Sequence, residues 1–256
     1  MLKTSLALML AVYAFPSIAK MSEATPIIGI VGAMDVEVEA LLPIIEHQKV
    51  KTIGSHQFYI GELQGRPVVV TKSGVGKVNA AMTTTLLIEN FGVESLIFTG
   101  IAGASDPKLE PLDVVISTRL VQHDVDLTAF DRPKGLLPDY KDRYFYADSA
   151  LQKYAFDAAV ETLGNDAVYQ GIIASGDQFI ASKAVVTEIY QEFDAMAVEM
   201  EGAALGQVAD AFKVPYVVIR TISDKADGSA EMTYSDLKKA TADNSARITL
   251  NMLKRM

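Results

Sequence analysis

The sequence contains no cysteine and only three histidines. Without cysteine the protein forms no disulfide, binds no zinc through thiolates and uses no cysteine nucleophile. The histidines, His47, His56 and His123, lie far apart and show none of the short spacings of metal-binding sites. We therefore expect neither a metal nor another cofactor.

Positive charge is also scarce, because 23 lysines and arginines face 32 acidic residues and give a formal net charge of -9. Such a chain lacks the broad basic surface that a phosphate backbone requires, so we expect it not to bind nucleic acid. Half of the 256 residues are hydrophobic (50%), which is enough for one domain with a large buried core. We expect that single domain to cover residues 20–256.

Long apolar runs are missing except in the first 19 residues. Lys3 precedes an apolar run over residues 5–15, and Ser17-Ile18-Ala19 ends it as a small-x-small cleavage site. This order is typical of a secretory signal peptide, which predicts a periplasmic or secreted protein with no membrane anchor after cleavage. Two alternatives remain open: an uncleaved anchor, or translation that begins at Met21 and leaves the protein in the cytoplasm.

Strand-like and helix-like patterns alternate over the rest of the chain. Strands are expected at residues 26–31, 57–63, 67–72, 95–99, 113–121, 168–174, 196–198 and 216–222, and helices at 36–46, 77–90, 147–162, 182–192, 201–212 and 234–253. The alternation predicts a three-layer α/β/α fold with a central, mostly parallel, twisted sheet. The segment 123–143 shows little periodicity and is expected to be a functional loop beside the site.

Three acidic residues follow strand-like stretches: Glu37, Glu201 and Asp224. Ligands of open α/β sheets bind beyond the carboxyl ends of the strands, so these acids are expected to meet in one pocket. Each has an ordinary alternative as a helix-dipole or capping residue. An acid flanked by apolar strand residues, however, needs a partner or ligand that offsets its desolvation. The combination favours acid/base chemistry on a neutral or cationic substrate.

The glycine-rich segments do not match nucleotide-binding motifs. In Ser73-Gly74-Val75-Gly76-Lys77 the first glycine and the magnesium-binding hydroxyl of a phosphate loop are absent, and residues 99–104 lack dinucleotide spacing. No G-x-S-x-G nucleophile motif occurs either. Small residues after the strand at 95–99 would still let backbone amides approach a ligand closely.

Several separate blocks resemble those of the 5'-methylthioadenosine/S-adenosylhomocysteine nucleosidases, and the resemblance extends from Pro26 to the C-terminus. The blocks are residues 28–34 (IGIVGAM) followed by Glu37, 72–78 (KSGVGKV), 99–103 (TGIAG), 123–130 (HDVDLTAF), 175–180 (SGDQFI), 197–201 (AVEME) and 220–224 (RTISD). The resemblance implies a purine nucleoside phosphorylase-like fold, a homodimer, and hydrolysis of the N-glycosidic bond with release of adenine.

The same resemblance assigns roles to individual residues. It implies that Glu37 activates the attacking water, that Asp224 protonates adenine N7, and that Glu201 binds the ribose hydroxyls. Further substrate contacts are implied for Met200, Ile180, Phe179, Gly103, Ser223, Arg220, Met34, Val75 and Tyr234, and, across a dimer interface, for Leu127, Phe130 and Pro138. The two carboxyl groups match what inverting glycoside hydrolysis requires, namely an acid at the leaving base and a base that activates water.

Rival functions remain open at this point. A purine nucleoside phosphorylase would need several arginines for phosphate, whereas this chain has few and carries Glu37 where an anion would be repelled. A futalosine-type hydrolase uses similar chemistry, and a non-catalytic exported binding or adhesion protein would retain the fold without turnover. Ile101 replaces a small hydroxyl residue of many relatives, Val36 replaces an acid, and Tyr234 replaces a phenylalanine.

Overall fold

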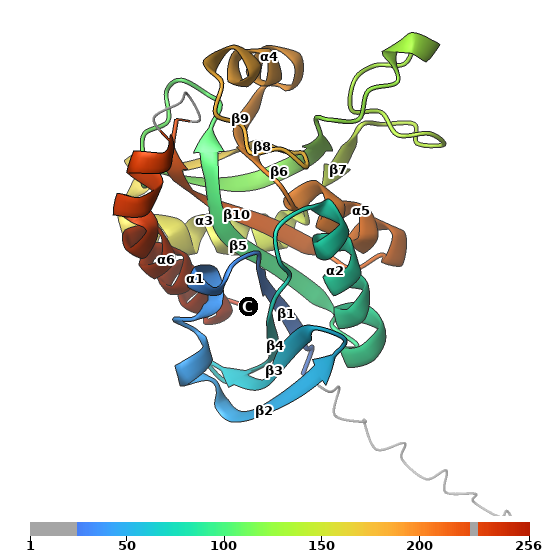
Figure 1. Ribbon diagram of the computed structural model, residues 1–256. Coiled ribbons are helices and arrows are strands. Elements are labelled where there is room, and N and C mark those ends of the chain that lie inside the picture. The colour runs from blue at the N-terminus through green and yellow to red at the C-terminus, as the bar shows by residue number, and fades with distance from the viewer. Residues whose placement is uncertain (1–24, 226–229) are drawn as a thin grey trace, which may run out of the picture.

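One ten-stranded sheet forms the centre of the computed structural model (Figure 1). The structure describes residues 25–225 and 230–256, and it describes only the backbone of residues 230–236, 238 and 239. The predicted signal peptide, residues 1–19, lies outside the described residues. Within the described ranges, no helix has the length and hydropathy needed to cross a membrane.

The strands and helices mostly occupy the predicted positions. The strands are β1 (Ile28–Gly32), β2 (Glu46–Ile53), β3 (His56–Leu63), β4 (Arg66–Lys72), β5 (Ser95–Ala104), β6 (Val114–Gln122), β7 (Tyr144–Tyr146), β8 (Val168–Ser175), β9 (Ala195–Glu199) and β10 (Tyr216–Asp224). The helices are α1 (Asp35–Val38), α2 (Lys77–Phe91), α3 (Ser149–Leu163), α4 (Lys183–Phe193), α5 (Gly202–Phe212) and α6 (Ala230–Leu253).

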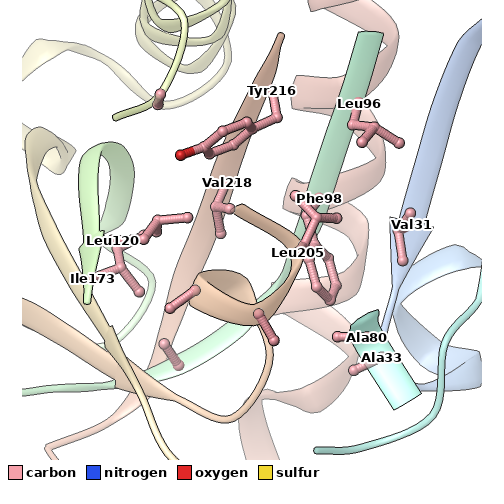
Figure 2. Packing of buried hydrophobic residues seen from close by; sticks show 14 of the residues in the cluster. Val31, Ala33, Ala80, Leu96, Phe98, Leu120, Ile173, Leu205, Tyr216 and Val218 are labelled. Carbon is pink, nitrogen blue, oxygen red and sulfur yellow. The ribbon is translucent and has the colours of Figure 1, made fainter. Parts of the chain in front are cut away.

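Helices cover both faces of the sheet and give the predicted three layers (Figure 1). On one face α2 and α5 bury Ala80, Leu87 and Leu205 in a cluster that also contains Phe98 of β5; Figure 2 shows this packing. On the other face α1, α3 and α6 contribute a second buried cluster. Strand β1 is buried along its whole length, which explains its continuous apolar sequence. The α/β class is confirmed.

The sheet is mixed, and its longest pairings, β5 with β10 and β6 with β8, are parallel. Strand β1 pairs in parallel with β4 and β5, and β6 pairs in parallel with β8. Antiparallel pairings join β2 to β3, β3 to β4, β6 to β7, β6 to β10, and the end of β5 to β9. Since β5 also pairs with β10, the strands β5, β10, β6, β8 and β9 close into a ring. This closure brings the carboxyl ends of β5, β9 and β10 to one place.

Two local predictions were wrong. The helix expected at 36–46 ends at Val38, because Pro43 has no N–H to donate to the carbonyl of Glu39 and so cannot continue the helix. Residues 42–44 form a short 3-10 turn, and the chain then enters β2. Strand β2 was missed because it is a polar edge strand, exposed over nearly all its length, without an apolar alternation.

Candidate active site

A cavity of about 250 Å³ lies beyond the carboxyl ends of β1, β5, β9 and β10. The acids that the sequence predicted to converge, Glu37, Glu201 and Asp224, all line it. Its full lining is Ala33, Met34, Glu37, Val75, Ile101, Ala102, Gly103, Phe179, Val198, Glu199, Met200, Glu201, Ser223 and Asp224. Because these residues come from segments that lie far apart in the sequence, the cavity depends on the assembled sheet.

Glu37 is held at the start of α1 by backbone N–H groups. Its Oε2 accepts hydrogen bonds from Ala33 N at 2.5 Å and Met34 N at 2.9 Å, and its Oε1 accepts one from Ile101 N at 3.0 Å. The side chain is only 4% exposed. Burial raises the pKa of Glu37, and this effect outweighs the opposing influence of Arg220 and of the three amides. A carboxylate with a raised pKa and a fixed orientation suits a general base.

A glycine in β5 allows Glu37 and Arg220 to approach each other. A Cβ atom at Gly100 would lie 2.7 Å from Glu37 Oε1 and 2.9 Å from Arg220 Nη1, so any other residue would displace both charged groups. This is the close approach that the small residues of the 99–104 segment permit. The glycine therefore belongs to the electrostatics of the site and not to a nucleotide loop.

Arg220 and Glu199 form a fully buried ion pair beneath the cavity. Arg220 Nε lies 3.2 Å and Nη2 2.5 Å from Glu199 Oε2, and the side chains are 1% and 3% exposed. Glu199 also accepts hydrogen bonds from the Ser175 hydroxyl and from Gly202 N at the start of α5. The guanidinium lies 4.3 Å from the centre of the Phe98 ring. These contacts compensate the desolvation of both charges, which makes the pair rigid.

Glu201 interacts less closely with Arg220 than Glu199 does. Its Oε1 accepts a hydrogen bond from Gly76 N at 2.7 Å, while its Oε2 is 4.0 Å from Arg220 Nη2. Burial and the neighbouring charge of Glu199 raise the pKa of Glu201 to about 8. Glu201 therefore binds a proton more readily than an exposed glutamate does.

Asp224 ends β10 after an irregularity in the pairing with β5. The register shifts between Ile222 and Asp224, so Asp224 lies opposite Gly103. Such bulges redirect side chains at strand ends. Asp224 is 4% exposed, and its Oδ2 accepts a hydrogen bond from the Ser223 hydroxyl at 2.6 Å. We call Glu37, Glu199, Glu201, Asp224 and Arg220 the carboxylate wall.

Apolar side chains surround the opening of the cavity. Met34, Val75 and Phe179 belong to the lining, and Val75 is 47% and Phe179 64% exposed. We call these three residues the apolar mouth. Ile180 borders a smaller adjoining cavity of about 40 Å³ that shares Phe179, Met200 and Asp224 with the main one. The structure thus brings the site residues predicted from the 175–180 block to the same place.

Some predicted substrate contacts do not line the cavity in the described structure, and one of them, Arg220, lies behind it in its pair with Glu199. Leu127, Phe130 and Pro138 lie on the segment 123–143, which projects away from the sheet as the green to yellow-green extension of Figure 1. Phe130 is 76% exposed there. The single chain does not test their predicted role in a neighbour's pocket. The side chain of Tyr234 lies outside the described residues.

Several contributors to the site were not identified from the sequence. Glu199 was noted only as a flanking acid, and Ser175 was not singled out beyond its place in the block, although both end buried strands. The amides of Ala33, Ile101 and Gly76 leave no side-chain signature, so only the fold shows that they bind the carboxylates. Among the described residues, no group of three or more His, Asp or Glu side chains could hold a metal ion.

Comparisons with known proteins place these features in context. The profile of the phosphorylase superfamily matches residues 27–256. The chain is 42% identical over 230 residues to a 5'-methylthioadenosine/S-adenosylhomocysteine nucleosidase of Bacillus licheniformis, covering 90% of this chain and 99% of that protein. It is 36% identical over 229 residues to an aminodeoxyfutalosine nucleosidase of Campylobacter jejuni, with 90% and 99% covered.

Solved structures show the same similarity. The Neisseria meningitidis 5'-methylthioadenosine/S-adenosylhomocysteine nucleosidase, solved in complex with methylthio-immucillin-A, matches with a TM-score of 0.86 and 39% identity. The match covers 90% of this chain and 99% of that one. Fold similarity and sequence similarity therefore each cover about nine-tenths of the chain.

Proposed function

This chain belongs to the phosphorylase superfamily and, within it, to the 5'-methylthioadenosine/S-adenosylhomocysteine nucleosidases, and from that premise we propose its function. It is an N-glycosyl hydrolase that cleaves 5'-methylthioadenosine and S-adenosylhomocysteine into adenine and the corresponding thioribose. Water is the second substrate.

The carboxylate wall supports this reaction chemically. Cleavage of an N-glycosidic bond develops positive charge on the ribose and negative charge on the departing base. In the proposed mechanism Glu37 takes a proton from the water that attacks the anomeric carbon, and Asp224 gives a proton to adenine N7 as the bond breaks. Glu201 binds the ribose hydroxyls. The fixed orientation of Glu37 means that little reorganisation accompanies the reaction.

One observation favours hydrolysis over phosphorolysis. Among the described residues, the cavity lining contains Glu37, Glu199, Glu201 and Asp224 but no lysine or arginine. Arg220, beneath the cavity, is already paired with Glu199. A phosphate ion would meet carboxylates and find no free cation, whereas neutral water carries no such penalty. The same four acids also disfavour a non-catalytic binding protein, because burying them costs free energy that serves no purpose without turnover.

A futalosine-type nucleoside is the second candidate substrate. It is favoured by the 36% identity to the Campylobacter jejuni enzyme and by the open apolar mouth, where Val75 and Phe179 remain exposed. An open mouth leaves room for a 5' substituent larger than a methylthio group. Both candidate substrates release a base by the same chemistry, so they differ only in the 5' substituent that the apolar mouth must accommodate.

We also propose a two-fold homodimer in which Leu127, Phe130 and Pro138 complete the neighbour's apolar mouth. The support is a group of exposed apolar residues on α2 and α5, which lie on the side of the molecule from which the segment 123–143 projects (Figure 1). Val78 and Met82 of α2 and Phe212 of α5 are 77%, 42% and 42% exposed. Val78 and Phe212 line one surface hollow together with Ala81 and Ala211, and contiguous exposed apolar side chains mark interaction sites. A monomer in light scattering that retains full activity would refute the dimer.

Export is a further proposal, and it rests on residues 1–19 alone. A cleaved signal peptide would leave a mature chain that begins at Lys20. N-terminal sequencing of native protein is expected to read from Lys20, whereas a start at Met1 or Met21 would contradict export with cleavage.

Release of adenine in phosphate-free buffer tests the function. Purified protein is mixed with 5'-methylthioadenosine, S-adenosylhomocysteine or a futalosine-type nucleoside, and free base is measured. We expect rapid release of adenine from the two adenosine thioethers, unchanged when phosphate is added. Release that depends on phosphate would indicate a phosphorylase. Absence of release from every substrate would indicate a binding protein.

A further inference from the structure

Three polar residues at and around the start of α2 form a closed hydrogen-bonded network. The backbone N–H of Lys77 donates to Asp177 Oδ1 at 2.8 Å, and the backbone N–H of Asp177 donates to Asp124 Oδ2 at 3.0 Å. Lys77 Nζ closes the circuit by donating to Asp124 Oδ1 at 2.6 Å. We call Lys77, Asp124 and Asp177 the Lys77 network. It joins the start of α2 to two segments that lie far away in the sequence.

The ion pair in this network is more buried than the surface pairs of the protein. The side chains of Lys77 and Asp124 are 17% and 20% exposed, whereas those of Lys153 and Asp157 on α3 are 72% and 42% exposed. Burial alone would raise the pKa of Asp124, but the hydrogen bonds from Lys77 and from the Asp177 amide outweigh it and lower that pKa. A partly desolvated, charge-assisted contact of this kind is worth more than an exposed pair.

Lys77 itself does not line the active-site cavity. Its ammonium is occupied by Asp124 and by Gln122 Oε1 at 3.1 Å. Neither Lys77 nor Asp124 belongs to the lining of the cavity or of its smaller neighbour. The lysine of the glycine-rich segment at 73–77 must therefore act, if it acts in the reaction, through other residues.

The network touches the site from two sides. Gly76, directly before Lys77, donates its N–H to Glu201 Oε1 at 2.7 Å and has a φ of 99°. Asp177, directly before the 178–180 segment, holds the first amide of α2. Phe179 and Ile180 on that segment line the two cavities. The Lys77 network therefore fixes the position of the Gly76 peptide, which orients Glu201. It also fixes the start of the segment that carries Phe179.

We propose that Lys77 is a positioning residue that, through Asp124 and Asp177, holds the 178–180 segment and the Gly76 amide in their substrate-binding geometry. The inference rests on the proposed nucleosidase function, because it assigns the 178–180 segment to the base and Glu201 to the ribose. Asp124 also begins the projecting segment 123–143, so the network links that segment to the binding site.

The geometry predicts which kinetic constant changes. Glu37 and Asp224 are oriented by Ala33, Met34, Ile101 and Ser223, none of which belongs to the network. The reacting groups therefore keep their places when the network is broken. Substrate binding must then order the 178–180 segment. The free energy that this ordering costs weakens substrate binding and raises KM. A broken network should raise KM far more than it lowers kcat.

The test compares Lys77→Met with Lys77→Arg and with a matched control. Lys77→Met keeps the length of the side chain and removes the charge; Lys77→Arg keeps the charge. Lys153→Met removes the exposed partner of Asp157 and serves as the control. We expect Lys77→Met to raise KM for 5'-methylthioadenosine by roughly 10-fold or more with kcat within about 3-fold of wild type. Lys77→Arg should recover most of the loss, and Lys153→Met should match wild type.

A second measurement separates positioning from simple stability. Asp124→Asn alone and combined with Lys77→Met gives a double-mutant cycle, and coupling between the two changes is expected. Amide hydrogen exchange of residues 176–180 should accelerate in Lys77→Met while exchange in α3 stays unchanged. A lower thermal midpoint with unchanged KM and unchanged exchange at 176–180 would overturn the proposal, as would additive effects in the cycle.

Failure of the inference differs from failure of the proposed function. If wild-type protein releases no adenine, the nucleosidase function is wrong, and hydrogen exchange at 176–180 still decides whether Lys77 holds that segment. If wild type is active and Lys77→Met has the same KM and the same exchange, the nucleosidase function stands and the positioning role is wrong.

Discussion

The carboxylate wall and the apolar mouth occupy the same cavity but are built in opposite ways. In the wall Glu37, Glu201 and Arg220 are 4%, 5% and 1% exposed, and each is held by contacts within the chain. In the mouth Val75 and Phe179 are 47% and 64% exposed. The residues of the carboxylate wall are held entirely within one chain. The apolar mouth, in contrast, leaves apolar side chains exposed to water.

In the proposed mechanism this difference separates the residues of the reaction from those that select the substrate. Groups that stabilise a transition state work best when they are oriented before the substrate arrives, and the wall meets that requirement. Apolar side chains around a 5' substituent need only exclude water, so they tolerate variation and completion by another subunit. Changes in the wall should therefore lower kcat, whereas changes in the mouth should raise KM.

The largest effect is expected for Asp224→Asn. An amide can donate a hydrogen bond to the base but cannot transfer a proton to it, so hydrolysis of adenosine thioethers should be abolished. The measurement is kcat on folded variant protein, with Asp157→Asn on α3 as the control. A substrate analogue with carbon at position 7 should resist the wild-type enzyme as well. Rapid cleavage of that analogue would contradict the role and leave Asp224 as a strand-end cap.

A smaller but distinctive effect concerns pH and Glu201. Its pKa is raised from 4.5 to about 8 in the folded protein, so the folded state binds a proton that the unfolded state releases between these pH values. The corresponding stability is therefore full below the unfolded pKa and is lost as pH rises through about 8. The raised pKa of Glu37 contributes in the same direction.

The measurement is the free energy of unfolding between pH 5 and 9. We expect a steeper decline with rising pH in wild type than in Glu201→Gln, which cannot ionise. Glu39→Gln, an exposed change near Glu37, should keep the wild-type slope. Equal slopes in wild type and Glu201→Gln would show that Glu201 is ionised throughout this range.

The smallest effect is expected at the mouth. Phe130→Ala should raise KM by roughly three- to ten-fold and weaken self-association, because it removes apolar area that a partner subunit would bury. The kcat should change little, since the wall is untouched. Val50→Ala, a change at an exposed apolar residue of β2, is the control. A wild-type KM in Phe130→Ala would show that the segment 123–143 does not contribute to the substrate pocket.

The sequence predicted the wall better than its supports. Glu37, Glu201 and Asp224 could be found because each follows an apolar strand, and the rule for strand ends then brings them together. Their hydrogen-bond donors could not be found, because the amides of Ala33, Ile101 and Gly76 carry no side-chain signal. Only the fold shows that Gly100 leaves space for Glu37 and Arg220.

The helices and strands of the fold were mostly predictable, whereas the pairing of the strands was not. Buried strands such as β1 and β10 could be predicted from their runs of apolar residues. The closed ring of strands was not predictable, because β5 changes partner from β1 to β9 along its length and no local pattern encodes that change. Strand β2 was missed because an exposed edge strand has no face to bury. Local patterns thus reveal elements, whereas pairing depends on the whole chain.

The central claim is that Glu37, oriented by three backbone amides, activates water at the anomeric carbon. Its most direct test is turnover of 5'-methylthioadenosine by wild type and Glu37→Gln in water labelled with heavy oxygen, with phosphate present. The account predicts one labelled oxygen in the thioribose released by wild type, no ribose phosphate, and a loss of turnover on the order of hundreds or more in Glu37→Gln with adenine binding retained. A near wild-type rate in Glu37→Gln, or a ribose phosphate as product, would contradict it.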